Sequence, residues 1–163
     1  MLILLAAAAL AATTPATAAV PANPQIDFAA FARLARKLEP IRARRRIPLA
    51  QFQALAMSGK AIILDARSAD AFAAGHIDGA INLPLTDFAA QALAIALPDR
   101  KRAVLIYCNN NFTNNVAPVM LKSVAVSLNI QTFINLDAYG YRNVWELADR
   151  VDFNDPKVRW VKS

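Results

Sequence analysis

Short runs of consecutive apolar residues alternate along the chain with longer stretches in which apolar residues recur every three or four positions. Short continuous runs are typical of strands that are buried on both faces of a parallel sheet. The strongest is residues 103–107, Ala-Val-Leu-Ile-Tyr. The sequence predicts strands at residues 46–47, 61–64, 80–83, 103–107 and 131–136.

The stretches between these runs are predicted to form helices. In the first, residues 26–39, basic residues lie between the apolar positions, and Pro40 is expected to end the helix. The other predicted helices are residues 49–57, 68–74, 88–97 and 119–128, with a final short helix at residues 145–147. Strands that alternate with helices of about ten residues predict an α/β domain with a parallel sheet.

The first residues of the chain have a different pattern. Residues 1–12 form an apolar run, shorter than the roughly 20 residues of a membrane-spanning helix. Pro15 and an Ala-Thr-Ala tripeptide ending at Ala18 follow, which is typical of a secretory signal peptide. We expect cleavage after Ala18, or after Ala22 as second choice, and export to the periplasm or the cell exterior. No Lys or Arg precedes the apolar run, so an uncleaved membrane-associated helix stays open as the alternative.

The chain has one cysteine, Cys108, and one histidine, His76. A single cysteine excludes an intramolecular disulfide, and one Cys with one His provides too few ligands for a closed zinc site. A chain of 163 residues that is 56% hydrophobic can bury a core without either. We therefore expect no metal and no cofactor, and we expect a monomer.

The formal net charge of +6 is concentrated in one stretch, because six arginines and one lysine lie between Arg33 and Arg46. Such a stretch is most often a solvated face, and weak contact with an anionic surface is the alternative. No zinc-finger spacing and no RNA-stacking motif accompanies it, so nucleic acid is not an expected partner.

A family motif begins at the end of the predicted strand 61–64. Asp65-Ala66-Arg67 is followed by Phe72 and then by Gly-His-Ile-Asp-Gly-Ala-Ile-Asn-Leu-Pro at residues 75–84. More than ten positions match, in order and spacing, the pattern D-x-R … F/Y-x-x-G-H-I-x-G-A-x-N-x-P. This segment closely resembles the rhodanese-like domain family.

Cys108, directly after the predicted strand 103–107, is similar in position to the catalytic cysteine of that family. Leu136, Gly140 and Trp145 resemble a stretched form of the family's closing motif, L-x-G-G-x-x-x-W. The resemblance covers roughly residues 47–147. It divides the chain into a signal peptide (1–18), an N-terminal helix with a basic connector (19–46), a rhodanese-like domain (47–150) and a polar C-terminal tail (151–163).

The resemblance implies a rhodanese-like, doubly wound parallel sheet with helices on both faces and the cysteine at its C-terminal edge. The implied activity is sulfur transfer: the Cys108 thiolate takes a sulfur atom from a small anionic donor such as thiosulfate, and the resulting persulfide passes it to an acceptor thiol or cyanide. The loop after the cysteine is expected to bind the anion through backbone N–H groups. Its residues are Asn109, Asn110, Asn111, Phe112 and Thr113.

The loop departs from the family pattern. It contains no Lys or Arg, and Asn111 stands where family loops often have Gly, so we expect left-handed backbone there. The next predicted helix begins near Pro118, ten positions after Cys108, and its dipole is expected to lie too far from the sulfur to act on it. Asn114 replaces the arginine of the C-x5-R phosphatase relatives, which argues against phosphatase activity. A non-catalytic module that binds a partner or senses oxidants through Cys108 is the alternative function.

The remaining motif residues are expected to support the site rather than to react. Asp65 and Arg67 are expected to hydrogen-bond loop backbone at the end of their strand. His76 is expected to stabilise a turn between Gly75 and Gly79.

Overall fold

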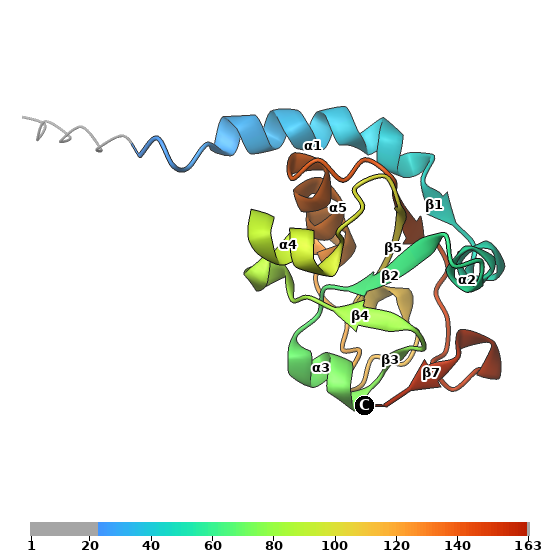
Figure 1. The fold of residues 1–163 in the computed structure, drawn as a ribbon. Helices are drawn as coiled ribbons and strands as arrows, with labels where there is room; N and C mark the ends of the chain where they lie inside the picture. The colour runs from blue at the N-terminus through green and yellow to red at the C-terminus, as the bar shows by residue number, and fades with distance from the viewer. Residues whose placement is uncertain (1–22, 163) are drawn as a thin grey trace, which may run out of the picture.

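The computed structural model describes residues 23–162, so the expected signal peptide lies outside the described residues. Five strands form one parallel sheet in the order β1-β6-β5-β2-β4 (Figure 1). Their bounds are β1 Arg46–Ile47, β2 Ala61–Asp65, β4 Ala80–Asn82, β5 Ala103–Tyr107 and β6 Val144–Leu147. The predicted doubly wound α/β fold is therefore confirmed.

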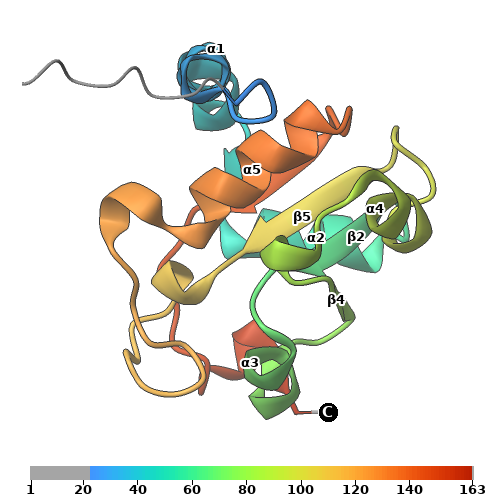
Figure 2. The same ribbon diagram turned by 90° about the vertical axis from the view of Figure 1, so that its left-hand side faces the viewer.

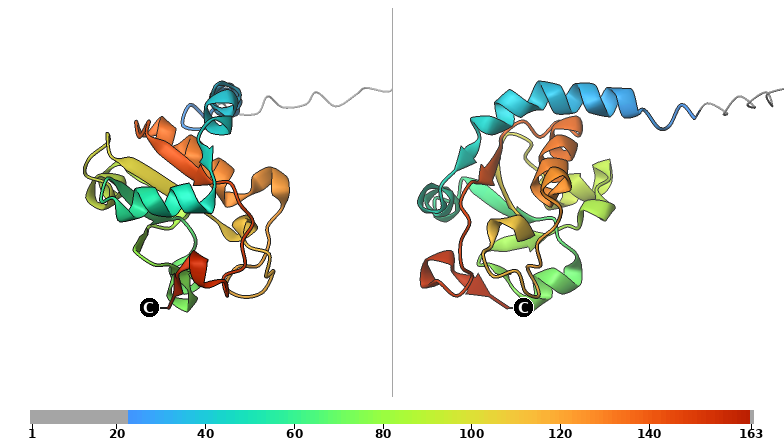
Figure 3. Two further views of the ribbon diagram at one scale, coloured as in Figure 1. Left: turned by 90° about the vertical axis from the view of Figure 1, so that its right-hand side faces the viewer. Right: turned by 180° about the vertical axis from the view of Figure 1, so that it is seen from behind.

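Helices cover both faces of this sheet because alternate strand residues point in opposite directions. On β5, Val104 and Ile106 belong to an apolar cluster with residues of α1, α4 and α5, whereas Leu105 and Tyr107 belong to a second cluster with α2. Figure 2 shows α5 on the near side of β5, and the opposite view in Figure 3 shows α2 in front. The helix bounds are α1 Phe28–Ala43, α2 Leu49–Met57, α3 Ala69–Ala74, α4 Ala90–Ala96 and α5 Leu128–Ala138.

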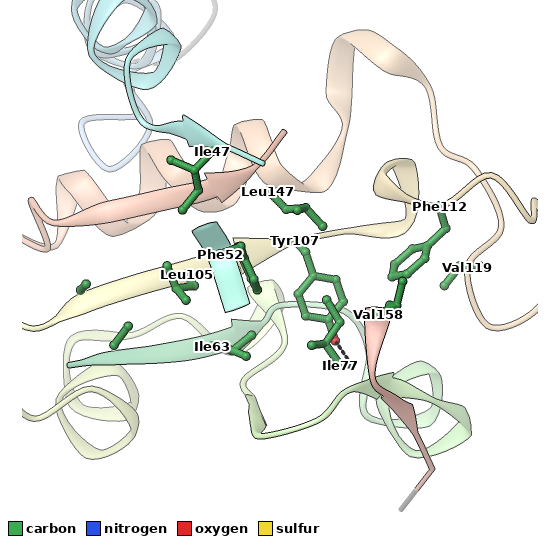
Figure 4. Packing of buried hydrophobic residues seen from close by; sticks show 12 residues of the cluster. Ile47, Phe52, Ile63, Ile77, Leu105, Tyr107, Phe112, Val119, Leu147 and Val158 are labelled. Carbon is green, nitrogen blue, oxygen red and sulfur yellow. Dashed lines mark hydrogen bonds between the residues drawn. The ribbon is translucent and has the colours of Figure 1, made fainter. Parts of the chain in front are cut away.

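The cluster on the α2 face continues beyond the sheet. Figure 4 shows Phe52 of α2 and Ile63 packed around Leu105, with Phe112 and Val158 beyond the end of β5. Phe52, Phe112 and Val158 are fully buried. Burying side chains of this size contributes about 1.5–3 kcal/mol each, so the segment after β5 is held by the same core as the strands.

Helix α1 runs past the residue that was expected to end it. Pro40 lies inside the helix, which continues to Ala43. The last turn is held from outside, because Arg42 donates two hydrogen bonds of 2.6 Å to the carboxylate of Glu146 in β6. Ile41 also packs against the cluster beneath α1. These contacts outweigh the backbone hydrogen bond that a proline cannot donate.

The predictions for residues 119–147 are wrong in three places. No α-helix forms at residues 119–128, the predicted strand 131–136 lies inside helix α5, and the predicted final helix is strand β6. In α5 the buried residues are Asn129, Thr132, Phe133, Ile134, Leu136 and Asp137. Most of them recur at three- or four-residue spacing, and this period outweighs the strand propensity of Thr, Phe and Ile.

The residues expected as a polar tail pack onto the domain. Strand β7, Trp160–Val161, pairs antiparallel with β3, His76–Ile77. Trp160 contacts the rings of Phe112 and Phe153 edge-on and face-on, respectively. The C-terminal residues therefore cover the glycine-rich turn of the family motif. None of the helices within residues 23–162 is both long and apolar enough to cross a membrane.

Gly75→Ala is expected to destabilise the domain by about 3 kcal/mol, because the added Cβ would lie 2.6 Å from the Trp160 indole Cε2 and force the ring to move. Gly79→Ala is the matched control in the same turn, with no atom within 4 Å of the added Cβ and a φ of +80°. It should lose only about 1 kcal/mol, from backbone strain. Urea unfolding measures both, and equal losses would contradict the role of Trp160.

Candidate functional site

Cys108 lies directly after β5, at the carboxyl end of the sheet, where ligands bind to open α/β folds. It follows Ile106 by two residues and so shares the α5 side of the sheet. Its exposed fraction is only 1%. The sulfur therefore lies inside the protein and not on its surface.

Three backbone N–H groups are near enough to the Cys108 thiol to influence its pKa: that of Asn129 at the start of α5, and those of Asn110 and Asn111 in the loop. Burial has the largest influence and raises the pKa of the Cys108 thiol, while these three groups lower it. The net direction is upward. Burial therefore outweighs the three N–H groups, and Cys108 is less acidic than an ordinary cysteine.

A buried carboxylate adds to the upward shift. Glu146, in the neighbouring strand β6, is 3% exposed, and its charge raises the pKa of Cys108. Arg42 pairs with both of its carboxylate oxygens. This ion pair links α1 to the strand beside the thiol.

Asn111 holds the loop through its side chain. The amide oxygen accepts hydrogen bonds from the Cys108 N–H and from the Asn129 side chain, both 2.9 Å long. The amide nitrogen donates to the carbonyls of Leu147 and Asp149, at 2.8 and 3.1 Å. Asn111 lies in the short 3₁₀ helix η2, Asn109–Asn111, and is not among the residues with positive φ. The expected left-handed backbone is therefore wrong, and the residue acts through its amide.

The other four loop residues do not surround one anion. Asn109 donates to the carbonyl of Met120, and Asn110 exchanges two hydrogen bonds with the backbone of Lys122. Phe112 is fully buried in the core on the α2 face. Thr113 is exposed and binds the backbone of Val151. The loop thus anchors the following segment, and only its first residues lie near the thiol.

The helix after the loop begins late in sequence and yet reaches the sulfur. Residues 112–127 form an excursion between η2 and α5, and the chain then returns so that the Asn129 N–H faces Cys108. The expectation that the helix dipole lies too far away is therefore wrong. The N-terminal end of a helix favours negative charge, so it stabilises the thiolate form.

A pocket with a volume of about 770 Å³ lies beside the loop. Its walls come from the end of β2 and the start of α3, from the turn after β4, from residues of the 112–127 excursion and from α5. Among the described residues its charged lining groups are Arg67, Asp87 and Lys122. Asn109 lines the pocket but Cys108 does not, so the thiol lies behind the pocket wall. The loop itself contains no Lys or Arg, but Lys122 of the excursion lines the pocket beside it. The position of Lys122 depends on the path of the excursion, which the sequence pattern does not reveal.

Asp65 and Arg67 form a buried ion pair at the end of β2, with a shortest N–O distance of 2.6 Å. Arg67 also donates to the carbonyls of Gly75 and Pro118, which ties the motif turn to the excursion. Burial alone would lower the pKa of Arg67, but the hydrogen bond and charge of Asp65 raise it, so the guanidinium stays charged. Tyr107 donates to the same carboxylate, and burial raises the pKa of its phenol well above the usual value. These contacts indicate that Asp65, Arg67 and Tyr107 have structural roles.

His76 lies in β3 with its ring stacked on Phe72, and its Nδ1 is 2.9 Å from the Phe72 carbonyl. It does not line the pocket beside Cys108. Gly75 permits the close approach of Trp160, and Gly79 has positive φ in the turn that follows. These residues shape the turn between α3 and β4.

The proposed closing motif does not form one loop. Leu136 is buried in α5, Gly140 follows the end of that helix, and Trp145 lies in β6. Within residues 23–162 no group of three or more His, Cys, Asp or Glu side chains could hold a metal ion.

Residues 49–149 match the rhodanese-like domain family. This is more than half of the chain, and the chain therefore belongs to that family. The family match ends before β7, so the C-terminal strand that covers the motif turn lies outside the matched residues. No curated protein matches the chain.

Solved structures of similar fold include a rhodanese with anions from E. coli, 24% identical with a TM-score of 0.42, which covers 63% of this chain and 99% of that one. The wild-type structure of EanB is 27% identical with a TM-score of 0.48, over 63% of this chain and 23% of that one. A thiosulfate sulfurtransferase from Pseudomonas aeruginosa is 20% identical with a TM-score of 0.47, over 76% and 21%. This chain thus spans nearly all of the first and less than a quarter of the other two.

Asn111→Gly is expected to lower the free energy of unfolding by about 3 kcal/mol, because the buried partners of its side chain lose their hydrogen bonds. The matched control is Asn110→Gly, in the same 3₁₀ helix, whose amide is partly exposed. The control should lose about 1 kcal/mol, mostly from backbone entropy. Urea titrations compare the two, and a neutral Asn111→Gly variant would show that backbone conformation matters more than the amide.

Native Cys108 is expected to react with iodoacetamide more than about tenfold more slowly at pH 7.5 than the same thiol in the urea-unfolded chain. Because burial raises its pKa, the thiolate fraction increases only as the pH rises, and the native rate should still climb above pH of about 8.5. Intact mass after timed quenching gives both rates. A native profile that is already flat below neutral pH would show that the N–H groups outweigh burial.

Proposed function

We propose that this protein is a sulfurtransferase in which Cys108 carries a sulfur atom as a persulfide. The observation that carries the proposal is the position of Cys108, the only cysteine of the chain, directly after β5 at the carboxyl end of the sheet. The backbone N–H groups of Asn110, Asn111 and Asn129 favour its thiolate form there. Such a set of donors stabilises an anion without adding a titratable group. Membership of the rhodanese-like family supports the same chemistry.

The proposed reaction has two displacement steps. After the thiol has lost its proton to water, the Cys108 sulfur attacks the outer sulfur of a thiosulfate-type donor; a new S–S bond forms, the donor's S–S bond breaks, and sulfite leaves with the electron pair. An acceptor thiolate or cyanide then attacks the outer sulfur of the persulfide, and the Cys108 thiolate is released. The raised pKa of the thiol makes the first step faster as the pH rises.

The pocket supports the donor part of this proposal. Lys122 and Arg67 line it, and Arg67 is already paired with Asp65, so Lys122 is the cation available to an anionic donor. Asn109 forms part of the wall between this pocket and the thiol. A donor in the pocket reaches the sulfur when this wall moves locally, which the exposed residues of the excursion permit.

One observation favours a second function. Cys108 is almost completely buried, does not line the pocket and has a raised pKa. These are properties of a thiol protected from small reagents, as in a non-catalytic module that binds a partner. Such a module would use the same pocket without forming a persulfide.

Incubation with thiosulfate should add one sulfur atom to the intact mass of the full chain, and cyanide should then remove it and yield thiocyanate. Cys108→Ala should abolish both. Lys122→Gln should raise KM for thiosulfate about threefold to tenfold with little change in kcat, because it removes a charge that attracts the donor. Lys101→Gln is the control, since Lys101 is exposed and does not line the pocket.

No added mass and no thiocyanate between pH 7 and about pH 9, where an ordinary thiol ionises, would refute the transferase and leave the binding module. Persulfide formation that Lys122→Gln leaves unchanged would keep the transferase but remove the pocket as the donor site.

A further inference from the structure

The outer face of α1 is a row of cations. Arg33, Arg36 and Lys37 lie on one side of α1, Arg44 directly follows its last residue, and all four are exposed. The apolar face of the same helix is occupied, because Leu34, Leu38 and Ile41 pack against the cluster that contains α5. The cationic row therefore points away from the domain.

These charges are not neutralised by the protein itself. Within residues 23–162, Arg36, Lys37 and Arg44 form no ion pair, and Arg33 has only a 3.6 Å contact with the exposed Asp27. The basic residues on the other side are different, since Arg42 binds Glu146 and Arg45 stacks on Trp145. The row is thus free to bind an external anionic surface.

The N-terminal end of α1, with the residues just before it, carries exposed apolar side chains. Phe28 and Phe31 continue the side of the helix that bears Leu34 and Leu38 and do not lie on the cationic row. Ile26 and Phe28 are 74% and 80% exposed, and Phe31 is 46% exposed. In Figure 1 this end of α1 extends past α5, which leaves these side chains without the core that covers Leu38. A helix with cations on its polar face and exposed apolar side chains on another face is typical of helices that lie in a membrane interface.

We propose that α1 docks the protein onto the surface of an anionic lipid bilayer. The cations bind lipid head groups, and Ile26 and Phe28 insert at the leading end of the helix. A lipid surface fits better than nucleic acid, because phosphate binding alone gives no reason for large exposed apolar side chains next to the charges.

This docking would leave the Cys108 pocket accessible. The pocket is lined by residues of α3, of the turn after β4, of the excursion and of α5, and by none of α1. Figure 2 shows α1 at the end of the molecule opposite to α3. A protein bound through α1 therefore presents its pocket to the aqueous phase, where a small anionic donor is found.

The test is co-sedimentation of the full chain with vesicles of phosphatidylglycerol and phosphatidylcholine in equal parts, and with vesicles of phosphatidylcholine alone. The charge variant carries Arg33→Gln, Arg36→Gln, Lys37→Gln and Arg44→Gln. Each basic residue near an anionic surface contributes up to about fivefold to partitioning, so loss of all four should weaken binding to the anionic vesicles by about tenfold to several hundredfold. High salt should have a similar effect on the wild type.

The matched control carries Lys60→Gln, Lys101→Gln, Lys157→Gln and Lys162→Gln, which removes the same charge from exposed positions elsewhere. It should stay within about threefold of the wild type. Ile26→Ser with Phe28→Ser should weaken binding to anionic vesicles while leaving the charges intact. Phosphatidylcholine vesicles measure binding that does not depend on charge, including any by the apolar run at residues 1–12.

Equal binding by the wild type and the charge variant, or an equal loss in the control, would overturn the proposal. So would α1-dependent binding of double-stranded DNA under conditions in which the anionic vesicles are not bound. Circular dichroism of each variant shows that the fold is kept, and these results do not depend on whether Cys108 forms a persulfide.

Discussion

The side-chain amide of Asn111 is the interaction on which the arrangement of the site depends. Through its hydrogen bonds to Cys108, Asn129, Leu147 and Asp149 it joins the ends of β5 and β6 to the first turn of α5. Buried polar groups that are fully paired specify one arrangement of the chain, because each alternative leaves them unsatisfied. The N–H group of Asn129 faces the thiol only because this amide fixes where α5 returns after the long excursion.

Much of the fold could be predicted from hydrophobic pattern alone. The strands at residues 61–64, 80–83 and 103–107 are short continuous apolar runs bounded by turn residues, and the structure confirms them with shifts of one residue at most. The errors fall after Cys108. There α5 carries β-branched and aromatic residues, and β6 is too short to show a period. Both take their conformation from tertiary packing, which a local pattern does not contain.

The site could be predicted only at its centre. Cys108, the Asp65–Arg67 pair and the motif turn were recognisable because their spacing is a property of the sequence. Lys122 was not, because it reaches the pocket through an excursion whose path is set by hydrogen bonds to Asn109 and Asn110. The direction in which the thiol pKa shifts could not be predicted either. It depends on the balance between burial and three N–H groups, two of which come from the loop and one from α5.

The pairing of β3 with β7 has a consequence for the order of folding. Ribosomal synthesis proceeds from the N-terminus, so the turn around Gly75 is made long before Trp160, which covers it. In the same way β1 cannot pair until β6, which lies about 100 residues later in the chain, has been synthesised. The nascent chain can form the β2–β4 pair early, whereas both the first strand and the motif turn stay uncovered until synthesis is nearly complete. Contacts that close late in this way expose apolar surface to chaperones and proteases for most of translation.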